Sequence, residues 1–238
     1  MAAHLGRDTD QAIVDAGEAA REVVESLLRE YLGMPAAFPY LQAGAARDIA
    51  FKRIEAGEDF LSEDEVTLAV GAFLTWDETG GNYLLQEQGM AGLPEVLDTR
   101  TWFHSALLRK DIETILGHGV SASFGPSTRD YLQKLHAGLA SLDAVTRVAY
   151  MASFEAHAER MIEGLWERLA ELYDVDKNEL VYFHAHVGGD DPAEAYHVAT
   201  TAGMISRVVP QDRADDFVKQ LEEAYGLHVR WCGSIVAH

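Results

Sequence analysis

Residues 148–166, which read VAYMASFEAHAERMIEGLW, point most directly to the fold class, because they carry the inner face of a long helix. Apolar side chains recur every three or four residues over 143–172, which predicts a helix of roughly eight turns. Glu155 and Glu159 fall within about 20° of the centre of that apolar face. A buried carboxylate is costly unless it is paired, for example with a buried arginine, or bound to a metal ion. His157 falls on the opposite side, which we expect to face solvent.

A second concentration of polar groups lies in residues 182–197, which read YFHAHVGGDDPAEAYH. On a continuous helix, four side chains would share one face: His186, Asp190, Glu194 and His197. Imidazole and carboxylate together form the ligand set that iron, manganese or zinc prefers for oxygen chemistry or Lewis-acid catalysis. Gly188, Gly189 and Pro192 predict an irregularity in this helix. The alternative is a surface cluster around a helix break.

A further carboxylate is expected from the segment before residue 89. Glu87 lies three residues after Leu84, so helical spacing allows it to share the inward face of that residue. Glu78 lies four residues after Leu74 and is an equal candidate on spacing alone.

His104 aligns with Leu108, Ile112 and Ile115 on the apolar face of another predicted helix. A lone histidine on such a face is more often a core residue than a ligand. Taken together, however, carboxylates on two helices and histidines on two others are the components of a carboxylate-bridged two-metal site inside a helical bundle.

The rest of the chain also shows helical spacing, so the predicted fold class is all-α, in a single domain over residues 1–238. A weak alternation in 227–232 allows one short strand. Breaks between helices are predicted at Gly33 to Pro35, at Gly80-Gly81 and at Pro210. The other predicted helices are 10–32, 41–56, one that begins with a capping box of Ser62 and Glu65, 82–88, 99–116, 126–139, 178–208 and 212–225.

Charge and cysteine content exclude several classes of function. A net charge of −20 disfavours binding to nucleic acid or to anionic membrane surfaces. The single cysteine, Cys232, allows no intrachain disulfide, and neither a secretory signal nor a membrane-spanning run is evident. We therefore expect a cytoplasmic protein with a solvated acidic surface.

The motifs over about residues 60–205 resemble those of the haem-oxygenase-like dimetal oxidases. In that family a Glu precedes a glycine-containing turn and a His begins the next helix, as Glu87 and His104 do here. The family also has a Glu on its second core helix, matched by Glu155, and a His-x3-Asp motif, matched by His186 and Asp190.

The last histidine of the family motif has no direct counterpart, because position 193 is Ala193. His197 stands one turn later. Either a helix distortion brings His197 into place, or Glu194 with His197 replaces the family's Asp-x2-His. The choice between Asp190 and Glu194 therefore stays open.

The resemblance implies a haem-oxygenase-like bundle of about seven to nine helices with a metal-binding core over about residues 60–205. It implies two Fe(II) ions, dioxygen as co-substrate and an external reductant. The implied ligands are Glu87, His104, Glu155, His186, Asp190 or Glu194, and His197.

Residues 186–197 are similar to an azetidine-forming branch of this family, which implies a free amino acid as substrate. The expected reaction is desaturation of L-isoleucine or L-valine followed by closure of a C–N bond. The alternatives are a related oxidase that forms a nitrile or another N-oxidised product, and a helical binding protein that buries these groups as salt bridges. Cofactor-free hydrolases of this fold need a pocket cysteine, and Cys232 lies in the tail. The tail from Leu227 is a candidate homodimer contact.

Overall fold

The computed structural model describes residues 21–187 and 192–236, apart from the side chains of Arg21 and of residues 192–195. Over these residues the secondary structure is helical, with ten α-helices and no strand, which confirms the predicted all-α class. The elements are α2 (Arg21–Ala56), α3 (Ser62–Glu78), α4 (Gly81–Gln88), η1 (Gly89–Leu97), α5 (Thr99–Trp102), α6 (His104–Leu116), α7 (Pro126–Leu139), α8 (Ala144–Tyr173), η2 (Lys177–Glu179), α9 (Val181–Val187), α10 (Pro192–Val208), η3 (Gln211–Arg213) and α11 (Ala214–Val236).

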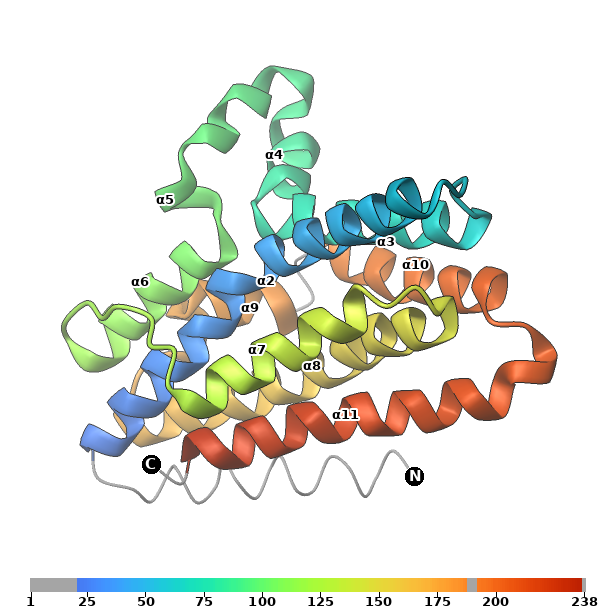
Figure 1. Ribbon diagram of the computed structural model, residues 1–238. Helices are drawn as coiled ribbons and strands as arrows, with labels where there is room; N and C mark the ends of the chain where they lie inside the picture. The colour runs from blue at the N-terminus through green and yellow to red at the C-terminus, as the bar shows by residue number, and fades with distance from the viewer. Residues whose placement is uncertain (1–20, 188–191, 237–238) are drawn as a thin grey trace.

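Helix α8 is the central element of the bundle, and it contacts α3, α7, α9, α10 and α11. Helices α7, α8 and α11 lie side by side along their length (Figure 1). His157 is therefore buried, with 3% of its surface exposed, because α11 covers the side of α8 that was predicted to face solvent. Glu159, predicted near the centre of the buried face, is exposed.

Helix α11 also corrects the weak strand prediction for residues 227–232, which are helical. Leu227 and Trp231 are four residues apart and both buried, as are His228 and Cys232. Over only six residues, these pairs are consistent with helical periodicity as well as with alternation. The longer apolar stripe of α11, which extends back to Phe217, packs against α8 and α7.

Helix α2 runs unbroken for 36 residues, so the predicted break at Gly33 and Pro35 is wrong. A proline inside a helix removes one hydrogen bond and crowds the preceding turn. Here Pro35 and Pro39 lie among fully buried apolar side chains such as Leu32 and Phe38, so tertiary packing holds the helix together.

Helix α3 begins and ends at sequence signals, although its capping residue differs from the prediction. The carboxylate of Asp64, rather than Glu65, accepts a hydrogen bond from the backbone N–H of Leu61 at 3.1 Å. At the other end Gly80, with φ of 79°, allows the turn into α4, which confirms the predicted break.

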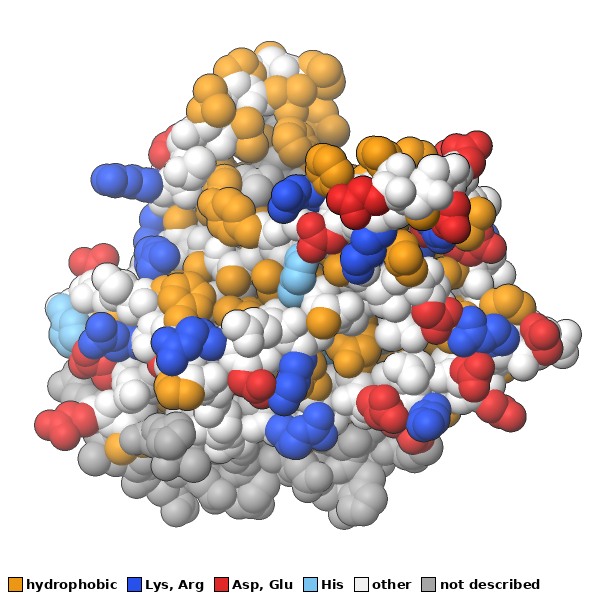
Figure 2. Space-filling model, viewed as in Figure 1, with side chains coloured by type: hydrophobic (Ala, Val, Ile, Leu, Met, Phe, Trp, Pro, Cys, Tyr) orange, Lys and Arg blue, Asp and Glu red, His pale blue; other side chains and the backbone are white. Residues whose placement is uncertain are grey.

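The segment α4–η1–α5 projects from one side of the bundle (Figure 1). Hydrophobic side chains gather on this projection (Figure 2). None of the described helices combines the length and the apolar character needed to cross a lipid bilayer.

Candidate metal centre

A small cavity lies where five helices meet inside the bundle. Its volume of about 40 Å³ leaves room for a few waters or ions, since one water needs about 10–15 Å³ on this measure. It is lined by Met34, Pro35 and Phe38 of α2, Leu74 and Glu78 of α3, Phe154, Glu155, Ala158, Glu159 and Ile162 of α8, Tyr182 and His186 of α9, and His197 of α10. Polar ligand-type groups thus enter an otherwise apolar space.

The first group of ligand-type side chains comprises Glu78, His104 and His186. One potential ligand atom from each lies within 4.8 Å of the others. The last residue of α3 supplies the carboxylate, and the first residue of α6 supplies a buried imidazole whose Nδ1 is 3.4 Å from Glu78 Oε2. The rings of His104 and His186 meet edge to face with centroids 4.6 Å apart.

His186 is held in the neutral form that a metal ion requires. Its Nδ1 lies 2.7 Å from the carbonyl oxygen of Tyr182, which makes Nδ1–H the donor and leaves the Nε2 lone pair available. Burial, together with the neighbouring His104, lowers the pKa of His186 to about 4.

Helix α9 is positioned by Asp111 of α6. The buried Asp111 carboxylate accepts hydrogen bonds from the backbone N–H groups of Val181 and Tyr182, both at 2.8 Å, and a longer one from Phe183. These N–H groups belong to the unpaired first turn of the helix, so Asp111 anchors the element that carries His186.

The second group is centred on His197 of α10. Its Nε2 lies 2.9 Å from Asp77 Oδ2, and its Nδ1 lies 3.0 Å from Glu155 Oε2. Burial alone would lower the pKa of His197, but the hydrogen bonds to the two carboxylates outweigh burial and raise the pKa to about 11. The ring is therefore a cation clamped between two anions.

Asp77 is buried and held as a carboxylate. Burial favours its neutral form, but the contacts with His197, with His104 and with Asn82 outweigh burial and lower the pKa of Asp77. Asn82 Nδ2 donates to Oδ1 at 3.0 Å, so one oxygen faces α4 and the other faces His197.

The structure brings together four of the side chains singled out in the sequence, namely His104, Glu155, His186 and His197. Glu87 does not face inward as predicted; it is exposed on the projecting α4. Glu78, the equal candidate on spacing, occupies the inner position instead. Asp190 lies outside the described residues, as does the side chain of Glu194, so their ligand roles stay predictions.

Asp77 is the site residue that the sequence reasoning missed. It lies three residues after Leu74 and four after Phe73, so the periodicity that singled out Glu78 applied equally to Asp77. Because the two acids are adjacent, they reach the two groups of ligands from neighbouring positions at the end of α3.

The donor set fits a pair of divalent metal ions. Glu78, His104 and His186 offer one carboxylate and two imidazoles, and burial keeps the pKa of His186 low enough for its ring to be neutral at pH 7. Asp77, Glu155 and His197 offer two carboxylates and one imidazole, whose proton a metal ion would have to displace. Carboxylates that lie between two ions can bridge them.

The chain matches no protein-family model and no curated protein. Among solved structures it is similar to one from Nostoc punctiforme PCC 73102, described as a CADD-like protein of unknown function. That likeness has a TM-score of 0.66, covers 99% of this chain and 97% of that chain, and comes with 14% sequence identity. It establishes a shared fold and bears out the predicted haem-oxygenase-like helical bundle.

Proposed function

We propose that this chain is a non-haem diiron oxidase that activates dioxygen and oxidises a free amino acid. One observation carries the proposal: Glu78, His104 and His186 converge within 4.8 Å, beside the clamp formed by Asp77, His197 and Glu155. Two adjacent groups of carboxylate and imidazole ligands around one buried cavity suit a dinuclear site better than a single ion.

Bound Fe(II) would supply the electrons that reduce dioxygen and the oxidising power that removes hydrogen from an unactivated carbon, with an external reductant restoring the ferrous state. The protein would contribute His104 and the neutral His186 as terminal ligands, and Glu78 and Glu155 as candidate bridges. The apolar walls of the cavity, where Phe38 and Phe154 stack with centroids 3.9 Å apart, would exclude water from the reaction.

The substrate we propose is an aliphatic amino acid, L-isoleucine or L-valine, desaturated and closed to an azetidine. Its support is the similarity of residues 186–197 to the azetidine-forming branch. No lysine or arginine is among the described residues that line the cavity. The substrate carboxylate would therefore be held by metal or imidazole rather than by a lysine or arginine of this lining.

A helical binding protein without chemistry is the second candidate, because His197 already satisfies Asp77 and Glu155 as an ion-paired triad. The two candidates differ in metal uptake. The oxidase must exchange the proton on His197 for a metal ion, whereas the binding protein would keep the triad as a structural link between α3, α8 and α10.

The test is an anaerobic Fe(II) titration followed by stopped-flow mixing with dioxygen, with and without L-isoleucine. About two irons per chain and a visible absorption band that depends on L-isoleucine are expected. Iron uptake and dioxygen consumption without any response to L-isoleucine or L-valine would keep the oxidase and remove the azetidine assignment. No iron uptake would favour the binding protein.

A further inference from the structure

A groove with a volume of about 480 Å³ lies where the projecting segment meets the bundle, between Tyr40 of α2, Arg100 of α5 and Arg109 of α6. We call it the α5–α6 groove. Its volume falls within the range of small-molecule sites, about 300–1,000 Å³. On α6 it takes the face that carries Arg109 and Glu113, whereas His104 is buried on the opposite face of that helix. The groove is therefore separate from the candidate metal centre and does not depend on the proposed oxidase function.

Three basic side chains line this groove, namely Arg100, Arg109 and Lys110. Figure 2 shows Lys and Arg side chains gathered beside the base of the projection. Arg100 and Lys110 are exposed, and Arg109 is half-buried. Among the residues that the structure describes, none of the three side chains forms an ion pair or a hydrogen bond. Glu113 is the acid in the described lining, so the groove keeps a balance of two positive charges.

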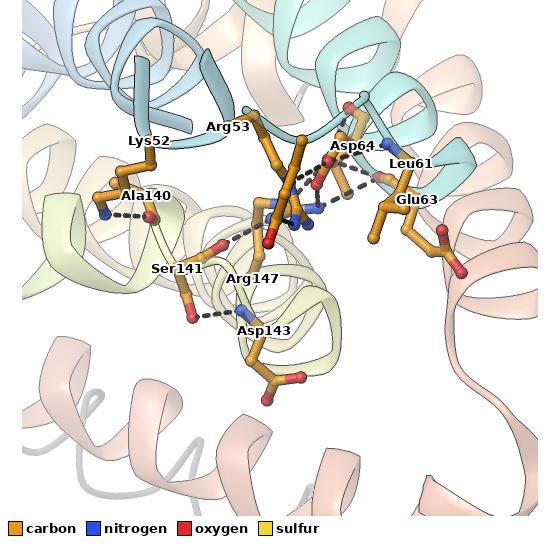
Figure 3. Close-up of polar contacts among 11 residues, drawn as sticks. Lys52, Arg53, Leu61, Glu63, Asp64, Ala140, Ser141, Asp143 and Arg147 are labelled. Atoms are coloured by element: carbon orange, nitrogen blue, oxygen red, sulfur yellow. Dashed lines mark hydrogen bonds and ion pairs between the residues drawn. The ribbon is translucent and has the colours of Figure 1, made fainter. Parts of the chain in front are cut away.

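Arginines elsewhere in the bundle are neutralised by acids. Arg53 and Arg147 converge on Asp64 (Figure 3), with nitrogen–oxygen distances of 3.0 Å and 2.9 Å. Arg213 pairs with Asp143 at 2.7 Å. The chain holds 39 acidic residues for 19 lysines and arginines, so acidic partners are abundant. Like charges gathered in one groove repel one another, and a bound anion would remove that cost.

The uncharged part of the lining offers aromatic surface and hydroxyl groups. Tyr40 is 71% exposed although it is a large aromatic residue, and Phe103 is half-buried. Aromatic rings of this kind stack against planar ligands. Thr99 and Ser105 add hydroxyl groups that can donate hydrogen bonds to an anion. The groove therefore combines positive charge with a surface for a ring.

We propose that the α5–α6 groove binds a small phosphorylated molecule that carries an aromatic or heteroaromatic ring. A phosphate monoester has a charge of about −1.5 to −2 at pH 7 and three acceptor oxygens, which matches a lining with two more cations than anions. Guanidinium groups bind phosphate through paired N–H donors, so Arg100 and Arg109 would hold this group. The ring would lie against Tyr40 and Phe103.

Other ligand classes match the groove less well. A carboxylate brings one negative charge and two oxygens, so it would leave part of the positive charge without a counterion. A cationic ligand would be repelled by the three basic side chains. A polynucleotide would bring many phosphates against a chain of net charge −20, which favours a single small molecule.

The test is calorimetric titration of the metal-free protein with phenyl phosphate, inorganic phosphate and benzoate, so that no bound metal competes for the anion. Phenyl phosphate is expected to saturate one site per chain, at least tenfold more tightly than either other probe, and to weaken as salt is added. No saturable binding of phenyl phosphate would overturn the proposal. Equal or tighter binding of inorganic phosphate or benzoate would also overturn it.

Variants separate the groove from the overall charge of the protein. Arg109→Gln is expected to weaken phenyl phosphate about tenfold, equivalent to about 1.4 kcal/mol. Tyr40→Ala, at an exposed position, is expected to weaken phenyl phosphate but not inorganic phosphate. Arg47→Gln is the matched control, because it removes the same charge from an exposed position of α2 outside the groove, and it should bind like the wild type. Equal affinities in Arg109→Gln and Arg47→Gln would contradict the assigned site.

Discussion

His197 is a proposed metal ligand, and in the metal-free protein the same ring is ion-paired with two carboxylates. Its pKa is raised to about 11, so its contribution to stability is fully present below the unfolded pKa of about 6.5 and is lost as pH rises through 11. A metal ion bound at one of its nitrogens must displace a proton at neutral pH.

We expect metal binding at pH 7 to release about one more proton in the wild type than in His197→Gln. Calorimetric titration with Zn(II) in two buffers of different ionisation enthalpy measures this release. The affinity of the wild type should also rise between pH 7 and pH 9. Metal uptake without proton release would mean that His197 keeps its clamp and is not a ligand.

Glu78 and Glu87 lie on either side of the turn between α3 and α4, so a direct comparison can be made between an inward carboxylate and an exposed one. Glu78 lies within 4.8 Å of His104 and His186, whereas Glu87 is exposed on α4. We expect Glu78→Ala to lose at least one of two bound irons and Glu87→Ala to lose none, as measured by iron content after gel filtration. If Glu78→Ala retained both irons, Glu78 would not be a required ligand and Glu87 would again be a candidate.

At this scale the sequence predicted residue types better than it predicted which acids face inward. Glu155, His186 and His197 were found because they interrupt apolar faces or share one. Glu78 and Glu87 could not be separated, because the direction of α4 depends on the turn at Gly80 rather than on helical spacing. Asp77 carried the right spacing and was overlooked.

Among the elements, α9 is short and depends on a partner for its position. Its seven residues gain little stability alone, since isolated helices of this length are marginal in water. Asp111 satisfies its first N–H groups and so fixes the helix that presents His186.

We expect Asp111→Ala to lower the free energy of unfolding by about 1–3 kcal/mol, because buried N–H groups lose their acceptor. It should also weaken iron binding, with urea denaturation and an Fe(II) titration as the measurements. Asp130→Ala, which removes an exposed ion pair with Lys134, is the control and should cost less than about 1 kcal/mol. If Asp111→Ala were less stable but bound iron as tightly as the wild type, the capping of α9 by Asp111 would not contribute to metal binding.

Most helices were predictable from apolar periodicity, and α7 was predicted with its observed ends at Pro126 and Leu139. The failures have tertiary causes. The break expected in α2 is overridden by packing around Pro35 and Pro39, and the strand expected within α11 by its contact with α8. A short stretch of sequence carries no information about the distant residues that will pack against it, so neither outcome could be predicted locally.

For the whole molecule, the buried contact between α8 and α11 makes stability sensitive to acid. His157 and His228 stack there with centroids 5.0 Å apart, and burial lowers the pKa of His157 to about 4. The unfolded chain therefore binds more protons than the folded protein between pH 6.5 and 4, so this contribution to stability is lost as pH falls through that window.

We expect the fall in unfolding free energy from pH 7 to pH 4.5 to be smaller in His157→Leu than in the wild type, by about 2–3 kcal/mol. Urea denaturation at the two pH values gives the comparison. Using the difference between the two proteins cancels other groups that titrate in the same range. An equal fall in both would show that His157 is charged or exposed in solution.

The central claim, that one buried cavity holds two metal ions, is tested most directly by anomalous X-ray scattering at the iron edge from crystals grown anaerobically with Fe(II). We expect two peaks inside the bundle, one among Glu78, His104 and His186 and the other beside Glu155 and His197. Peaks only at the surface, or a cavity without iron around an intact triad of Asp77, His197 and Glu155, would contradict the account.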